Sequence, residues 1–204
     1  MFLFEEKAMN YALKACQYEY LLNGTNSIWC KYFDKDLLKL LEYREDLKYN
    51  CKYSYKYELS RLMTCDLVSD LLKKLDEMQT NDSKRAIIYF VDDSSTMLSF
   101  LASMGLNYAA DSFNLDNIVD INENRAYKTS RMDPMNSNIA FVLYECPTAG
   151  SKRKSHKIRA FHNEKLIKLN NCEDCDLSDF RRQVESSLLQ KCKNSRQVCS
   201  SNLI

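Results

Sequence analysis

The chain has 204 residues, with 29 Lys and Arg against 28 Asp and Glu, nine cysteines, three glycines and two prolines. So little glycine and proline excludes the collagen-like, flexible-linker and proline-rich disordered classes. A hydrophobic content of 45% supports a packed core. A net charge of +1 offers no overall attraction to nucleic acid. We therefore expect one folded domain or slightly more, with no nucleic-acid partner.

Apolar runs in the sequence are too short for a membrane span. Ala86 to Val91, one of the longest, falls far below the ~20 residues of a spanning helix. We also expect no secretory signal within this chain, because Glu5 and Glu6 interrupt its apolar start. The many cysteines and the N-glycosylation patterns at Asn23 and Asn81 nevertheless indicate an oxidising compartment. These features predict a secreted or lumenal glycoprotein in which the odd cysteine count leaves at least one thiol unpaired.

The first 80 residues predict helices. Alanines and tyrosines recur at helical spacing up to a turn at residues 23–27. A second helix is expected to begin with Asp34 or Asp36 as its N-cap and to bury a leucine stripe. The alternating tyrosines of 53–57 predict an extended connector, and a third helix is expected from about Leu59 to Met78.

The pattern changes after residue 83. Residues 85–91 form a continuous apolar run, typical of a parallel strand that is covered on both faces. The run ends at Asp92, and a helix is expected over 97–104, closed by Gly105. A strand followed by a helix after several helices indicates an α/β architecture.

The rest of the chain is expected to complete a sheet. Residues 107–137 are polar and irregular, whereas 138–146 predict a strong strand. Alternation over 157–161 and 165–169 predicts a hairpin, and a C-terminal helix is expected from Leu177. The predicted organisation is a helical subdomain over 1–83, a sheet part over 84–191 and a disordered tail over 192–204.

The loop after the first strand is the best candidate for a functional site. Ligands of open α/β sheets lie at the carboxyl ends of strands, against the exposed amides of the following helix. Asp93, Ser94, Ser95 and Thr96 occupy this position. The same residue types are preferred helix caps, so a capping role and a ligand site both remain open.

Other candidates carry weaker signals. Cys172 and Cys175 have CxxC spacing but lack the second pair that zinc would need, so we expect a disulfide and no metal site. The basic run over 152–157 is expected to be a solvated start of the hairpin. His156 and His162, the two histidines of the chain, are expected at the surface. No cofactor is expected.

Several motifs, taken in order, resemble those of one family. Ser27-Ile-Trp-Cys30-Lys-Tyr-Phe33 and Leu41-Glu-Tyr-Arg-Glu-Asp-Leu-Lys-Tyr49 resemble "S-P-W-C-x-x-F" and "L-E-Y-x-x-D-L-K-Y-Y" of the multiple inositol polyphosphate phosphatases, which belong to the histidine acid phosphatase superfamily. The likeness continues through 88–96, 104–106, Ser130, Pro134, 138–146 and 163–164.

The resemblance implies a fold and a chemistry. It implies the C-terminal half of a phosphoglycerate-mutase-like α/β fold, and inositol polyphosphates as substrates that are hydrolysed through a phosphohistidine. The family's "R-H-G-x-R-x-P" nucleophile motif does not occur in this sequence. In the second signature, "H-A-E-T", Asp93 stands at the histidine, Ser94 follows, Ser95 stands at the proton-donating acid and Thr96 matches. The resemblance therefore implies that the chain is inactive as it stands.

The resemblance also suggests two disulfides and leaves other cysteines unassigned. Cys16 and Cys30 fall where the superfamily often has a bridge, and Cys172 and Cys175 lie near a C-terminal bridge of some relatives. The cysteines without an assigned partner are Cys51, Cys65, Cys146, Cys192 and Cys199.

Three functions remain open at this point: part of an inositol polyphosphate phosphatase, a secreted pseudo-phosphatase with a binding or structural role, and a small disulfide-bearing interaction domain. Half of a sheet domain is also expected to leave apolar surface partly uncovered at Ile87, Ile88, Phe90, Phe141 and Leu143.

Overall fold

The computed structural model describes residues 6–24, 27–80, 86–90, 93–106, 125–147, 154–169 and 172–193. These residues divide into two compact units, one up to Glu45 and the other from Asp46 onward. Asn81, Asp92, Cys199 and residues 194–204 of the expected disordered tail lie outside the described residues, whereas residues 192 and 193 of that tail are helical, which corrects its predicted start. Within the described part, no helix is both long and apolar enough to cross a membrane.

The first unit is helical. It contains α1 (Glu6–Asn23), the short 3-10 helix η2 (Trp29–Tyr32) and the beginning of α2 (Lys35–Tyr53). Of the two predicted caps of α2, the structure uses Asp34, whose Oδ1 accepts a hydrogen bond of 2.8 Å from the amide of Leu37. The small core of this unit contains Cys16, Phe33 and Leu41.

Two helical predictions near residue 60 are wrong in detail. The expected helix over 59–78 is broken into α3 (Glu58–Leu62) and α4 (Cys65–Thr80). The buried hydroxyl of Thr64 donates to the carbonyl of Arg61 at the break, as Thr does when it competes with helical hydrogen bonds. The connector after α2 is a turn and not extended, since the amide of Tyr57 donates to the carbonyl of Ser54.

The sheet is antiparallel throughout its described part. Its order is β1 (Ala86–Phe90), β2 (Asn138–Pro147), β3 (Lys154–His162) and β4 (Lys165–Ile167), and β5 (Cys175–Asp176) also pairs with β3. The prediction of a parallel, doubly covered strand over 85–91 is therefore wrong. β1 is an edge strand among the described strands, and its exposure alternates from residue to residue. A short apolar run does not distinguish these two situations.

The other predicted elements are confirmed. The strand over 138–146 and the hairpin are present, and Asn163 and Glu164 in the hairpin turn have positive φ values of 48° and 62°. Helix α5 (Ser94–Ser103) has Met104 as its C-cap and is followed by Gly105, which has φ +70°. The remaining helices are α6 (Thr129–Met132) and α7 (Leu177–Val184), which continues into a π-helical turn over Glu185–Leu189.

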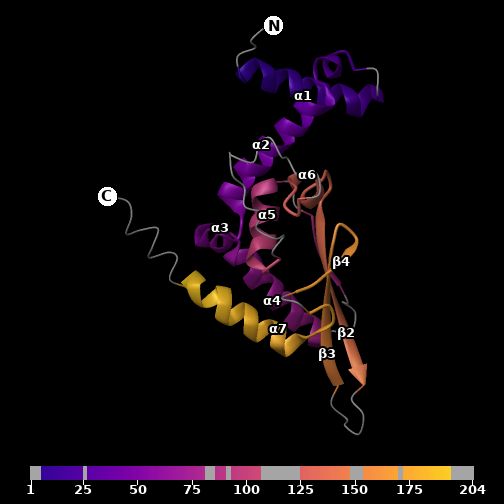
Figure 1. The fold of residues 1–204 in the computed structure, drawn as a ribbon. Coiled ribbons are helices and arrows are strands. Elements are labelled where there is room, and N and C mark those ends of the chain that lie inside the picture. Colours follow the sequence, from indigo (N-terminus) through magenta and orange to yellow (C-terminus); the bar gives the residue numbers. More distant parts are fainter. Residues whose placement is uncertain are drawn as a thin grey trace, which may run out of the picture. The chain divides into compact units, whose positions relative to one another are not determined.

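Helices α4, α5 and α7 lie on one side of the sheet in the second unit (Figure 1). The apolar face of α4 and the alternate residues of β2 and β3 form a single core with α5 and α7. The expected uncovered surface is present at Ile88 and Phe90, which are 53% and 72% exposed. It is absent at Phe141 and Leu143, because the helices bury this face of β2. The second unit is thus a partial α/β fold.

Three disulfides are present among the described residues. Cys16 is bonded to Cys30 and Cys172 to Cys175, and a third bridge joins Cys65 to Cys192. The sequence spacing contained no signal for the third bridge, whose cysteines are 127 positions apart. Cys51 and Cys146 are free thiols.

Candidate functional site

The four candidate residues of the sequence lie at the start of α5, where Asp93 caps the helix. Its carboxylate accepts hydrogen bonds from the amide of Ser95 at 3.4 Å and from the hydroxyl groups of Ser95 and Thr96. These hydrogen bonds, that of the Ser95 hydroxyl above all, lower the pKa of Asp93. Asp93 therefore caps α5, and its carboxylate keeps a negative charge at the N-terminal end of this helix.

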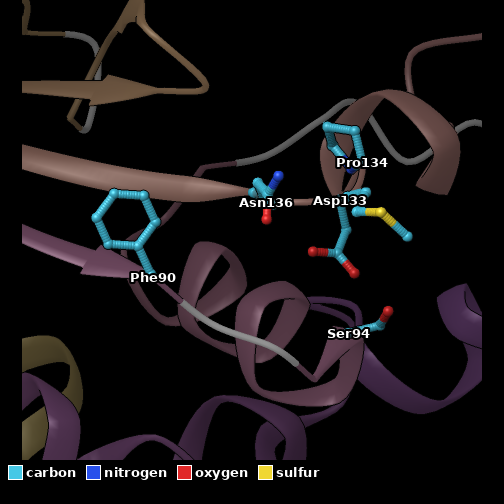
Figure 2. A pocket seen from close by; sticks show the side chains of 7 residues that line it. Phe90, Ser94, Asp133, Pro134 and Asn136 are labelled. Carbon is cyan, nitrogen blue, oxygen red and sulfur yellow. The ribbon is translucent and has the colours of Figure 1, made fainter.

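A cavity of about 750 Å³, here called the α5 cavity, lies beside this capped helix start (Figure 2). It is lined by Phe90 at the end of β1, by Ser94, and by residues 133–137, which form the turn before β2. Of the four candidates, Ser94 is thus the one that lines the cavity. The hydroxyl groups of Ser95 and Thr96 instead donate hydrogen bonds to the carboxylate of Asp93.

Asp133 brings a carboxylate to the α5 cavity. Figure 2 shows its carboxylate pointing toward the start of α5, where Ser94 lies. Burial raises the pKa of Asp133, and the negative charge of Asp93 adds to this rise. Hydrogen bonds with the Ser94 and Ser137 side chains and the charge of His162 oppose it.

His162 is buried, so its predicted surface position is wrong. The register of β2 and β3 pairs His162 with Ile139, and both residues belong to the core side of the sheet. Burial lowers the pKa of His162, while a hydrogen bond with the backbone of Met132 and the charge of Asp133 act in the opposite direction. The other histidine, His156, lies farther along β3, opposite Glu145, and does not line the α5 cavity.

The hairpin turn supports the wall of the α5 cavity. Asn163 accepts hydrogen bonds from the hydroxyl of Ser137 at 3.0 Å and from the amide of Asn138 at 3.1 Å. Glu164 accepts a hydrogen bond of 2.8 Å from the side-chain amide of Asn138. The Asn163–Glu164 pair, which the sequence analysis noted only as a resemblance, therefore holds the turn that carries Asp133.

Sequence reasoning missed Asp133 as a member of this site and did not foresee the burial of His162. The polar segment with Pro134 just before the strand at 138 was an available signal, since turns at strand ends often carry functional side chains. The burial of His162 depends on strand register, which one sequence does not reveal.

The chemistry of the α5 cavity is acidic. Asp133 is the only charged residue among its described lining residues, and Asp93 lies close enough to affect its pKa. A phosphate group would therefore meet repulsion here. Within the described residues, no group of three or more His, Cys, Asp or Glu side chains is placed to hold a metal ion.

Comparisons with known proteins agree on one family. The family model for the histidine phosphatase superfamily (branch 2) matches residues 2–163. The chain is 28% identical to multiple inositol polyphosphate phosphatase 1 of Gallus gallus over 198 residues, which is 92% of this chain and 43% of that protein. The Homo sapiens protein of the same name is 26% identical over 91% of this chain, and the Drosophila melanogaster protein is 28% identical over 91%.

The chain spans less than half the length of these curated relatives, between 39% and 43% of each. The matched region nevertheless includes the start of α5, the turn at 133–137 and most of the sheet. Since the family model covers well over half of the sequence, this chain belongs to the histidine phosphatase superfamily, branch 2.

Proposed function

We propose that this chain is part of a multiple inositol polyphosphate phosphatase-like protein of the secretory pathway and does not hydrolyse phosphomonoesters as it stands. The observation that carries the proposal is the capping role of Asp93, whose hydrogen-bonded carboxylate stands where the resemblance places a histidine. The relatives named multiple inositol polyphosphate phosphatase 1 support the family assignment.

Two further properties of the site argue against catalysis. The hydroxyl of Ser95 donates to Asp93, and a serine hydroxyl does not protonate a leaving alcohol near neutral pH. The ring of His162 is buried and hydrogen-bonded to the backbone of Met132, so it is not presented as a nucleophile. A phosphate ester in the α5 cavity would also face the carboxylate of Asp133, close to the negative charge of Asp93.

The test is phosphate release from inositol hexakisphosphate and from p-nitrophenyl phosphate. We expect no release above that of a mock-purified control. The double substitution Asp93→His and Ser95→Glu is expected to leave this result unchanged, because the nucleophile has no source in this chain. Turnover that disappears on mutation of His156 or His162 would overturn the proposal.

The location of the site is tested separately in a longer protein. When the chain is joined to an upstream half with an R-H-G-x-R-x-P motif, the same double substitution should raise the rate of phosphate release. No gain in that protein would mean that the family's late-strand site does not lie at Asp93–Thr96.

A second candidate function is that of a secreted pseudo-phosphatase that binds a ligand or has a structural role. The acidic α5 cavity and the disulfides favour it, because they give a stable fold with a cavity but without a phosphate-binding cation among its described lining residues. The genomic sequence upstream of Met1 separates the two. A signal peptide and an R-H-G-x-R-x-P segment there would identify a phosphatase, and their absence would favour the pseudo-phosphatase.

A further inference from the structure

The side chain of Asn163, in the turn between β3 and β4, is the centre of a hydrogen-bond network that the proposed function leaves unused. Its Oδ1 accepts hydrogen bonds from the hydroxyl of Ser137 at 3.0 Å and from the amide of Asn138 at 3.1 Å. Ser137 lines the α5 cavity. One side-chain oxygen therefore fixes the end of the turn that forms a wall of this cavity.

The amino group of the same side chain faces His162. Nδ2 of Asn163 lies 3.3 Å from Nε2 of His162, and 3.4 and 3.5 Å from two backbone carbonyl oxygens of α6. The oxygen and the nitrogen of an amide lie in one plane on opposite sides of the group, so they do not turn independently. The partner on the nitrogen side therefore decides whether the oxygen stays directed at Ser137 and Asn138.

This arrangement suits a neutral His162. The ring is buried, and a neutral imidazole has one donor and one acceptor nitrogen. With Nε2 as the acceptor, the ring takes a hydrogen bond from the amino group of Asn163. A protonated imidazole has a donor on both nitrogens. Its Nε2–H would then face an amino group that only donates, so protonation conflicts with the present orientation of Asn163.

We propose that His162 is a pH-sensitive switch for the turn at 133–137. Protonation of its ring turns the Asn163 amide over, so that Oδ1 accepts from Nε2 of His162. The amide of Asn138 then loses this acceptor, because the amino group that takes the place of Oδ1 only donates. The end of the turn, and with it one wall of the α5 cavity, is released in acid.

The charges around His162 favour the released form once the ring is protonated. Asp133 in the turn and Glu164 in the hairpin both favour a charged ring, and Asp93 at the start of α5 acts on Asp133. Lys165 of β4, opposite His162 in the register, is exposed, and the facing residue of β2 is apolar. Burial lowers the pKa of His162, so the switch should act below the ordinary value of ~6.5.

The test is hydrogen exchange of the full chain, followed by NMR at about pH 7 and at about pH 5.5 and corrected for the intrinsic rate at each pH. We expect the protection of the Asn138 amide to fall by about fivefold or more in acid, as the loss of one hydrogen bond implies. The β2 amides over 140–144 are the internal control and should keep their protection, because the switch does not reach the middle of the sheet.

Three variants make the test specific. His162→Gln cannot be protonated in this range, so the protection of Asn138 should be the same at both pH values. His156→Gln, at the other histidine, is the matched control and should keep the wild-type response. Asp133→Asn should also keep the response but move its midpoint to lower pH, because it removes a negative charge that favours the charged ring.

Several results would overturn the proposal: unchanged protection of Asn138, an equal loss over 140–144, a response that survives in His162→Gln, or one that disappears in Asp133→Asn. Wild-type NMR covers the case in which a variant does not fold. The ring protons of His162 should titrate with the same midpoint as the protection of Asn138, and two different midpoints would contradict the switch. No phosphate release is measured, so the outcome is separate from that of the proposed function.

Discussion

Burial shifts the pKa of Asp133, which lines the α5 cavity, and the pKa of His162, whose charge interacts with Asp133. It lowers the pKa of His162 and raises that of Asp133, so both shifts favour the uncharged form. A neutral imidazole suits the position of His162, because the side-chain amide of Asn163 lies 3.3 Å from its Nε2 and can donate to it.

The substitution His162→Gln should make the stability of the folded chain depend less on pH on the acid side of neutrality. In the unfolded chain this histidine takes up a proton near its ordinary pKa of ~6.5, whereas the folded chain resists protonation to lower pH. The unfolded state thus binds more protons in this window, and wild-type stability falls as the pH drops through ~6.5. The measurement is the melting temperature from about pH 7 to about pH 5.5.

The control for this prediction is His156→Gln, which should keep the wild-type slope. The raised pKa of Asp133 has the opposite effect on the pH profile, because the stability that this carboxyl contributes is lost as the pH rises. Both variants keep Asp133, so its contribution is the same in each. A His162→Gln slope equal to that of the wild type would contradict the prediction.

At the scale of elements, a buried ion pair joins α2 to the segment that leads into the α5 cavity. Asp46 and Arg125 are 0% and 4% exposed, and Nε of Arg125 donates to Asp46 Oδ2 at 2.8 Å. Asp46 Oδ1 also accepts from the amide and the hydroxyl of Thr129, the first residue of α6, at 2.8 and 2.6 Å. The turn at 133–137 follows α6 directly and depends on this anchor.

Asp46→Ala should destabilise the chain strongly. Removing one member of a buried pair leaves the other charge uncompensated, which costs ~3–5 kcal/mol of unfolding free energy. Urea unfolding measures this loss. The matched control is Asp36→Ala on the same helix, where the exposed pair with Lys39 should contribute less than ~0.5 kcal/mol. Equal losses in the two variants would contradict the prediction.

Elements with a strong pattern were predictable, and those defined by their neighbours were not. The strand at 138–146 and the hairpin after it combine alternation with turn residues, which are local signals. The antiparallel edge position of β1 depends on what lies beside it, so its apolar run misled the prediction. The break at Met63–Thr64 has neither glycine nor proline to mark it.

The candidate site divides in the same way. The loop at Asp93–Thr96 was located from its place between a strand and a helix. The turn that carries Asp133 is distant from this loop in the sequence. The tertiary contacts that bring the turn and the loop together cannot be read from the spacing of residues in one sequence.

At the scale of the whole molecule, the two units differ in how they are held together. The first has a small core next to the Cys16–Cys30 bridge. In the second, Leu71 and Leu75 of α4 share one core with Phe141 of β2, so this helix belongs energetically with the sheet. The family match applies to both units, since the matched residues 2–163 include parts of each unit.

The Cys65–Cys192 bridge makes the intervening chain a covalent ring. Hydrolysis of one peptide bond inside this ring opens it but releases no fragment. Protein cut once by trypsin between Cys65 and Cys192 should therefore migrate as one species in a denaturing gel without reductant and separate into two pieces once thiol is added. The Cys65→Ser variant should separate without reductant, and pieces released from the unreduced wild type would contradict the bridge. A chain with this connectivity can take a backbone cut inside the ring and keep its full mass.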